Sequence, residues 1–192
     1  RTAGGGIYQE NGKLSLLKVT ISNNSSNAGG GIYQNSSIGP QYDNSILSFV
    51  GGVVKNNSAV QDGGGLVLNG QDTIANITVT ANTAGNIGGG LHLAKATLAW
   101  INVTLSQNVS GNSAGWLSGY NAASTLTNVT ISGNTTAGNG GGVYLYGVSF
   151  TTLKNTIIAD NIANIDSPDI LQKSPAELYG LHNLIGDDSG MN

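Results

Sequence analysis

A run of glycines followed by an apolar residue recurs along the chain at near-constant intervals, and this repeat restricts the possible folds more than any other feature. The motif Gly-Gly-Gly-aliphatic begins at Gly4, Gly29, Gly63, Gly88 and Gly140. A degenerate copy, Ala114-Gly115-Trp116-Leu117, fills the midpoint of the longest interval. A period of about 20–50 residues is the signature of solenoids and related repeat architectures.

A second motif, of the type Val-Thr-Ile-Ser, precedes the glycines in most copies. Val19 and Ile21 alternate with Thr20 and Ser22, which is the period of a β-strand. A unit of short strands cannot bury its apolar side alone, but it can do so when stacked on identical neighbours. The chain is therefore predicted to be all-β, a right-handed parallel β-helix (solenoid) of about seven rungs of 25–26 residues, with three short strands per rung.

The repeat also predicts which residues form the core. The apolar residue after each glycine run should face inward in one column, formed by Ile7, Ile32, Leu66, Leu91, Leu117 and Val143. A second inward column should consist of Leu16, Ile74, Trp100, Leu126 and Leu153.

Asparagine recurs at two corners of each rung. One set follows the Val-Thr-Ile-Ser motif: Asn24, Asn57, Asn82, Asn108, Asn134 and Asn161. The other comprises Asn76, Asn102, Asn128 and Asn155, with Lys18 in the first rung. Stacked amides can hydrogen-bond along a column and satisfy the backbone groups of a tight bend, so both sets are expected to be structural ladders.

The repeat divides the chain into two parts. Residues 1–163 should form the β-helix, and the 33-residue interval between Asn24 and Asn57 indicates a longer exposed loop around 35–48. Residues 164–192 lose the motif and are expected to be an irregular segment that can cap the coil. Because the chain begins at Arg1, we expect a processed or excised piece of a longer protein.

Composition excludes several classes of function. Charged residues make up 9% of the chain and no basic stripe is present, which argues against a nucleic-acid partner. The apolar runs are too short for a transmembrane helix, and without Cys there is neither a disulfide nor a thiolate metal site. The acidic groups that could bind calcium are expected to be ordinary solvated loop residues, so no metal or cofactor is predicted; they are Asp160, Asp166, Asp169, Asp187 and Asp188.

One outward column contains the candidate ligand-binding residues. The residues that follow the inward aliphatics are Tyr8, Tyr33, Val67, His92, Ser118 and Tyr144. Tyr8 and Tyr33 should stack, because neighbouring strands lie about 4.8 Å apart. Such a ledge could hold a sugar by ring stacking, although an aromatic pair that only stiffens the sheet is the simpler interpretation. The candidate ligand-binding residues are Tyr8, Tyr33, His92 and Tyr144, with Tyr42 and Asp43 of the loop.

A second outward grid, of Thr20, Thr78, Thr104 and Thr130, resembles ice-binding faces, but it is broken by Val53 and is expected to be ordinary solvated sheet.

The tandem motifs resemble the repeats of polymorphic outer-membrane proteins and related adhesin passengers, a family of secreted bacterial β-helix proteins with a pectin lyase-like fold. The segment around Asn155–Asn161 and His182–Asp187 is similar to the last rung of cell-surface β-helix domains that precede an anchoring segment. Members of that family often carry Cys after Pro-Asp in this rung, where this chain has Ile170. The resemblance implies an extracellular or cell-surface location.

Three functions follow as hypotheses. The first is an adhesin-like or fibre-like scaffold, and the second is a carbohydrate-binding module that uses the Tyr column. The third is a polysaccharide lyase or hydrolase, which would need clustered or paired carboxylates. Asp43, Asp62 and Asp72 are expected to lie in loops and do not recur at one rung position, so enzymatic activity is not expected. The predicted partners are glycans, and either upstream rungs or a second subunit at the N-terminal end, where the first rung around Ile7 and Leu16 presents open strand edges.

Overall fold

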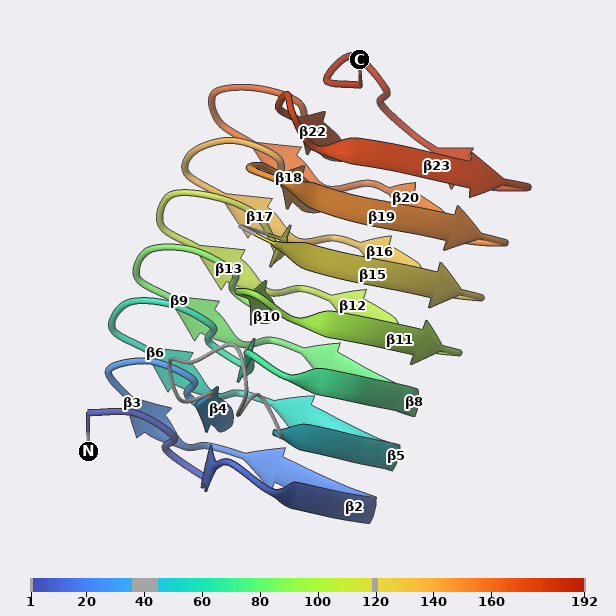
Figure 1. The fold of residues 1–192 in the computed structure, drawn as a ribbon. Coiled ribbons are helices and arrows are strands. Elements are labelled where there is room, and N and C mark those ends of the chain that lie inside the picture. Colours follow the sequence, from blue (N-terminus) through green and yellow to red (C-terminus); the bar gives the residue numbers. More distant parts are fainter. Residues whose placement is uncertain (1, 36–44, 119–120, 192) are drawn as a thin grey trace.

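The computed structural model describes residues 2–35, 45–118 and 121–191, with residues 117 and 118 described by their backbone alone. The chain is a parallel β-solenoid of about six turns, slightly fewer than the seven expected. Figure 1 shows the turns stacked in chain order, with the N- and C-terminal ends at opposite ends of the stack. We call one turn a rung, as above.

Three parallel sheets run along the coil. Sheet A has one strand per rung: β1 (Ile7–Glu10), β4 (Ile32–Asn35), β7 (Leu66–Leu68), β10 (Leu91–Leu93), β14 (Trp116–Ser118), β18 (Val143–Leu145) and β22 (Ile170–Gln172). Sheet C has the shortest strands: β3 (Ser25–Ser26), β6 (Ser58–Ala59), β9 (Thr83–Ala84), β13 (Val109–Ser110), β17 (Thr135–Thr136) and β21 (Ile162–Ala163).

Sheet B is the largest and bends around a second corner. Its first rungs contain the unbroken strands β2 (Lys13–Ser22), β5 (Ile46–Lys55) and β8 (Gln71–Thr80). In later rungs each is split into two: β11 (Thr97–Ile101) and β12 (Thr104–Ser106), β15 (Ala122–Thr127) and β16 (Thr130–Ser132), β19 (Ser149–Lys154) and β20 (Ile157–Ala159), and β23 (Glu177–Leu181) and β24 (Leu184–Ile185).

The glycine runs are required by the close packing of the backbone between sheets C and A. Gly29 has a φ of +62°, a left-handed conformation that side chains with a Cβ rarely adopt. A Cβ on Gly30 would lie 2.4 Å from the carbonyl oxygen of Gly64 in the next rung. The repeated tripeptide therefore marks a corner that favours glycine, although Ala114 and Ser167 take the left-handed position in two later rungs, with φ values of 59° and 54°.

The first inward column is confirmed except in one rung. Ile7, Ile32, Leu66 and Leu91 pair in register, but the next partner is Trp116 rather than the predicted Leu117. Ile87 pairs with Ser113 and Leu91 with Trp116, so this rung has one residue fewer than its neighbours between the two pairs. The deletion moves Trp116 into the core, where it is fully buried, and places the backbone of Leu117 beside His92 in the outward column. Ser118, predicted for that outward column, instead pairs with Leu93 and Leu145.

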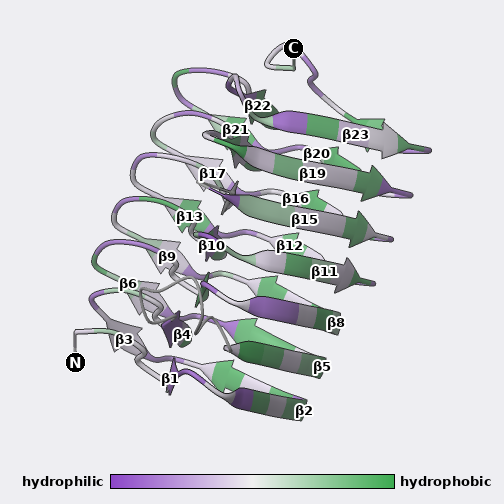
Figure 2. Cartoon of the chain, in the orientation of Figure 1, coloured by the Kyte–Doolittle hydropathy of each residue, from purple (hydrophilic) through white to green (hydrophobic). Residues whose placement is uncertain are grey.

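The second inward column is confirmed, with Phe49 supplying the rung that the sequence pattern left open. It runs through Leu16, Phe49, Ile74, Trp100, Leu126 and Leu153. The inner residues of this column are fully buried, whereas Leu16 at the end is only partly buried. The alternation of apolar and polar bands along the strands of sheet B is visible in Figure 2.

A third inward column contains polar side chains. Asp72, predicted to lie in a loop, is on β8 and 4% exposed. Its Oδ1 accepts hydrogen bonds of 2.8 Å from the backbone N–H of Leu47 and from Nε2 of Gln34. Ser124 and Thr151 continue the same column and are also buried. Because buried polar groups need partners, the two hydrogen bonds to Oδ1 explain why a carboxylate is tolerated at Asp72.

The Asn24–Asn161 ladder is confirmed as a buried hydrogen-bonded stack. In each step the backbone N–H and Nδ2 of one Asn donate to Oδ1 of the Asn in the next rung, at 2.9–3.1 Å. The second hydrogen of Nδ2 is donated to a backbone carbonyl one rung earlier, as in Asn108 to Val79. All the amides therefore point in the same direction along the coil.

Asp169 terminates this ladder, in contrast to the solvated position predicted for it. It is 3% exposed, and its Oδ1 accepts from the backbone N–H and Nδ2 of Asn161. Its Oδ2 accepts from the backbone N–H of Asp187 at 2.8 Å. A carboxylate, which only accepts, suits an end where every neighbour is a donor.

The other asparagine corner is exposed. Asn76, Asn102, Asn128 and Asn155 have φ values between 49° and 55°, and neighbouring amides hydrogen-bond at 3.0–3.3 Å. Asn tolerates this left-handed conformation better than most residues, so backbone geometry explains the choice of residue here.

The C-terminal segment continues the coil instead of being irregular. Within residues 164–192, β22, β23 and β24 pair with β18, β19 and β20 of the preceding rung. The predicted loop around 35–48 has β4 and β5 at its two ends, and residues 36–44 lie outside the described part of the chain. Among the described residues, no helix has the length and apolar character needed to cross a membrane.

Candidate functional site

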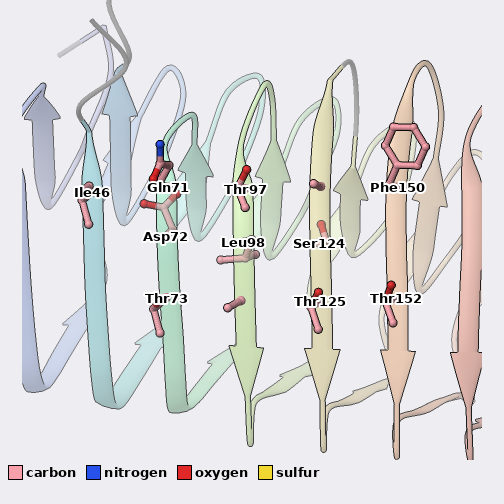
Figure 3. A pocket seen from close by; sticks show the side chains of 12 residues that line it. Ile46, Gln71, Asp72, Thr73, Thr97, Leu98, Ser124, Thr125, Phe150 and Thr152 are labelled. Atoms are coloured by element: carbon pink, nitrogen blue, oxygen red, sulfur yellow. The ribbon is translucent and has the colours of Figure 1, made fainter.

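A shallow groove of about 510 Å³ lies on the outer face of sheet B and crosses five rungs (Figure 3). Two rows of outward side chains line it. One row runs along the coil as Ile46, Gln71, Thr97, Ala123 and Phe150, and the other as Thr73, Ala99, Thr125 and Thr152.

The groove exists because the middle of each row is small. Ala99 and Ala123 leave space between the larger side chains of Gln71 and Phe150. Phe150 is 47% exposed, which is unusual for a large aromatic side chain, and it forms one end of the hollow. Alternation along the strands places these residues outward and the core residues inward.

The groove can bind, but it has no apparatus for acid–base chemistry. Its outward side chains carry hydroxyls, an amide, methyl groups, the aliphatic chain of Ile46 and a phenyl ring, all uncharged. Asp72 lies beneath the floor, where its Oδ1 is held by internal donors. This combination suits a neutral, hydroxyl-rich ligand. Sequence reasoning missed the site because no motif marks it, although the small outward residues Ala99 and Ala123 on neighbouring strands were a usable signal.

The Tyr column is split into separate parts. The rings of Tyr8 and Tyr33 are stacked, 5.7 Å between centroids and 1° apart in plane, so each covers one face of the other. Nδ2 of Asn35 donates to the Tyr8 hydroxyl at 3.3 Å. Burial raises the pKa of Tyr33, helped by nearby Tyr8 and Asp62. This mutual contact favours the interpretation in which the pair stiffens the sheet.

Tyr144 lies in the same column as Tyr33, four rungs further along the coil. Its ring packs against Tyr146, with 5.6 Å between ring centroids. The predicted ledge is therefore interrupted by Val67, His92 and Leu117. The predicted loop residues Tyr42 and Asp43 lie outside the described part of the chain.

His92 is mostly buried within this column. Its Nδ1 lies 4.0 Å from Oδ2 of Asp62, whose other oxygen accepts from Nδ2 of Asn86 at 2.8 Å. Burial lowers the pKa of His92, and the Asp62 carboxylate opposes that shift. A buried, neutral imidazole is part of the sheet and not an accessible ligand-binding group.

The remaining sequence candidates are dispersed. No group of three or more His, Asp or Glu residues converges on a possible ion within residues 2–35, 45–118 and 121–191. The threonine grid is in register, from Thr20 through Val53 and Thr78 to Thr130, and ends at Ile157.

Comparisons of the chain with models of protein families, with curated proteins and with solved structures find no match. The function is therefore proposed from the geometry of the solenoid and its surface.

Proposed function

We propose that this chain is a structural, adhesin-like scaffold of an extracellular or cell-surface protein. The observation that carries the proposal is the ladder, which runs without a break from Asn24 to Asp169 beside continuous apolar columns. Such a coil has one repeated set of contacts along its whole length, which gives a stiff support with a long, regular surface.

Two carboxylates that are deeply buried among the described residues support the same role. Asp72 lies on β8, whereas Asp169 lies in the bend before β22, and both accept hydrogen bonds inside the coil. A glycoside-hydrolase site needs two carboxylates facing one cleft at about 5–9 Å. The extracellular location rests on the resemblance of the repeats to secreted β-helix proteins.

Two measurements test this proposal. Antibodies against the chain should label intact cells of the organism that encodes it, and an absence of labelling would overturn the surface location. Incubation with uronate and neutral polysaccharides should produce no new reducing ends and no unsaturated products. Formation of either product would show that the chain is an enzyme and would contradict the scaffold proposal.

A second candidate function is binding of a neutral glycan in the groove of sheet B, favoured by the exposed ring of Phe150 beside Thr125 and Thr152. A ring face and several hydroxyls are the groups that a sugar engages. On a glycan array, Phe150→Ala should weaken binding about tenfold or more, whereas the matched change Tyr8→Ala should not. The reverse result would move the site to the Tyr column, and no binding by the unmodified chain would remove this candidate.

A further inference from the structure

The two ends of sheet B present unpaired strand edges. In the described part of the chain, β2 pairs only with β5 at one end, while β23 and β24 pair only with β19 and β20 at the other. An open edge of a sheet carries a row of free N–H and C=O groups that can pair with another strand. Since all strands are parallel, the edge at one end has the polarity needed to continue the edge at the other.

The two edges also match residue by residue. Lys13 and Glu177 are the first and last residues of a single outward column, which passes through Ile46, Gln71, Thr97, Ala123 and Phe150. By the same pairing, Leu14 and Leu178 end one inward column and Ile21 and Ile185 end another. A second molecule that continued the coil would place each of these pairs in adjacent strands.

The end residues are more exposed than their counterparts inside the coil. Leu47 and Val54, which follow Leu14 and Ile21 in their columns, are fully buried. In contrast, Leu14, Leu178 and Ile185 are only partly buried. Leu17 and Leu181, which end one outward column, are each 68% exposed. Stacking the two ends would remove this apolar surface from water.

Charge favours contact between unlike ends. The first rung carries Lys13 and Lys18 against Glu10. The segment 164–191 carries five carboxylates against Lys173: Asp166, Asp169, Glu177, Asp187 and Asp188. Two C-terminal ends would repel each other. In contrast, Lys13 would lie on the strand next to Glu177 of another molecule, with about 4.8 Å between the two strands.

We infer that a second copy of this chain docks head-to-tail, with its β2 on the edge formed by β23 and β24 of the first. The contact joins two different surfaces, so it can repeat and build an open stack. The inference rests on the proposed scaffold function and names its partner. The antibody and polysaccharide assays above do not depend on it, so either can fail without the other.

One segment of the chain competes with this docking. Residues 187–191, which we call the end strap, cross the C-terminal end and lie along the edge of β22. Gly190 pairs with Leu171, and its carbonyl accepts from the backbone N–H of Gln172 at 2.8 Å. The strap therefore occupies the place beside β22 that β1 of an incoming molecule would take. Full stacking requires the strap to move aside.

Sedimentation velocity over a concentration series, at low and high salt, tests the docking. The chain should self-associate, and high salt should weaken the association because the end charges are exposed. Lys13→Glu or Glu177→Lys alone should raise the dissociation constant about two- to fivefold, as expected for one exposed ion pair. The two changes together should restore it. The control Lys95→Glu, an exposed lysine between β10 and β11 in the middle of the coil, should have no effect.

Deletion of residues 189–192 provides a second arm. It keeps Asp187 and Asp188, including the Asp187 N–H that donates to Asp169, and it should strengthen association by removing the part of the strap that pairs with β22. Circular dichroism verifies that each variant is folded. A monomer at every concentration, in both the full chain and the deletion variant, would overturn the inference; a different occupant of the edge would give this result. If the dissociation constant is the same in Lys13→Glu, in Glu177→Lys and in the double variant as in the unmodified chain, the head-to-tail arrangement would be overturned.

Discussion

At the scale of single residues, asparagine serves the coil in two physically different ways. Asn108 is fully buried and uses its amide to satisfy backbone groups of neighbouring rungs. Asn102, at the other corner, is exposed and is suited to a φ of 55°. Both recur with the same spacing, so the repeat predicted two ladders without indicating which one is buried. Burial depends on the direction of the bend, which the spacing does not encode.

The buried ladder gives the first prediction. Asn108→Ala removes the acceptor of the Asn82 backbone N–H and the donor to the Val79 carbonyl, both inside the coil. Unfolding in urea should show a loss of about 1–3 kcal/mol, the cost of unsatisfied buried polar groups. The matched control is Asn112→Ala, an exposed Asn that donates to Asn86 at 3.3 Å. It should change stability by less than about 0.5 kcal/mol. Equal losses in the two variants would contradict a special role for the buried ladder.

At the scale of strands and columns, the period of the motif was sufficient to predict the fold and most of the core. The failure at Trp116 has a physical cause, because one residue is missing from the glycine corner of that rung. A deletion inside a motif leaves two possible alignments, and only the pairing of β14 with its neighbours decides between them. The buried position of Asp72 was missed because one of its partners, Gln34, comes from another sheet.

The corrected register predicts the effect of removing Trp116. Its side chain is fully buried and 5.9 Å from the ring of Trp100. Trp116→Ala should cost about 3–5 kcal/mol in chemical unfolding, because it leaves a large cavity in the column. Val109→Ala, on an exposed position of β13, is the control and should stay within about 0.5 kcal/mol. A small loss of stability in Trp116→Ala would favour the alignment expected from the sequence, in which Trp116 takes the place of a glycine and Leu117 faces the core.

The mostly buried His92, on the outer face of sheet A, leads us to expect that the stability of the fold depends on pH. Burial lowers the pKa of His92, so the folded chain binds a proton less readily there than the unfolded chain does. The stability contributed by neutral His92 is present above the unfolded value of about 6.5 and is lost as the pH falls toward the lowered pKa. The melting temperature should therefore decrease on acidification below about pH 6.5.

Three substitutions test whether His92 causes this dependence of the melting temperature on pH. His92→Gln should make the melting temperature less dependent on pH in this range, whereas His182→Asn, at an exposed position, should leave the dependence unchanged. Asp62 is the charged group nearest to His92, so Asp62→Asn should steepen the slope by removing the carboxylate that opposes the shift. A slope that persists in His92→Gln would show that another group is responsible.

At the scale of the whole molecule, each rung contacts only the rungs above and below it. Stability in such a structure is approximately a sum of rung terms and nearest-neighbour terms, so the ends, with one neighbour each, are the weakest parts. The sequence predicted an irregular segment that can cap the C-terminal end. It did not reveal that β22, β23 and β24 extend the coil, because this rung lacks both the glycine run and the ladder Asn. Asp169 and backbone pairing take over those roles.

The ladder offers a matched set of probes for the decrease in local stability from the middle of the coil to its ends. In six rungs a backbone N–H donates to a side-chain oxygen of the next residue in the ladder, at 3.0–3.1 Å, so the six donors differ mainly in position along the coil; they belong to Asn24, Asn57, Asn82, Asn108, Asn134 and Asn161. Amide hydrogen exchange near neutral pH should be slowest at Asn82 and Asn108. It should be about tenfold faster or more at Asn24 and Asn161, because opening an end rung breaks contacts on one side only. Uniform exchange at all six would mean that the coil opens as a single cooperative unit, and the nearest-neighbour description would be wrong.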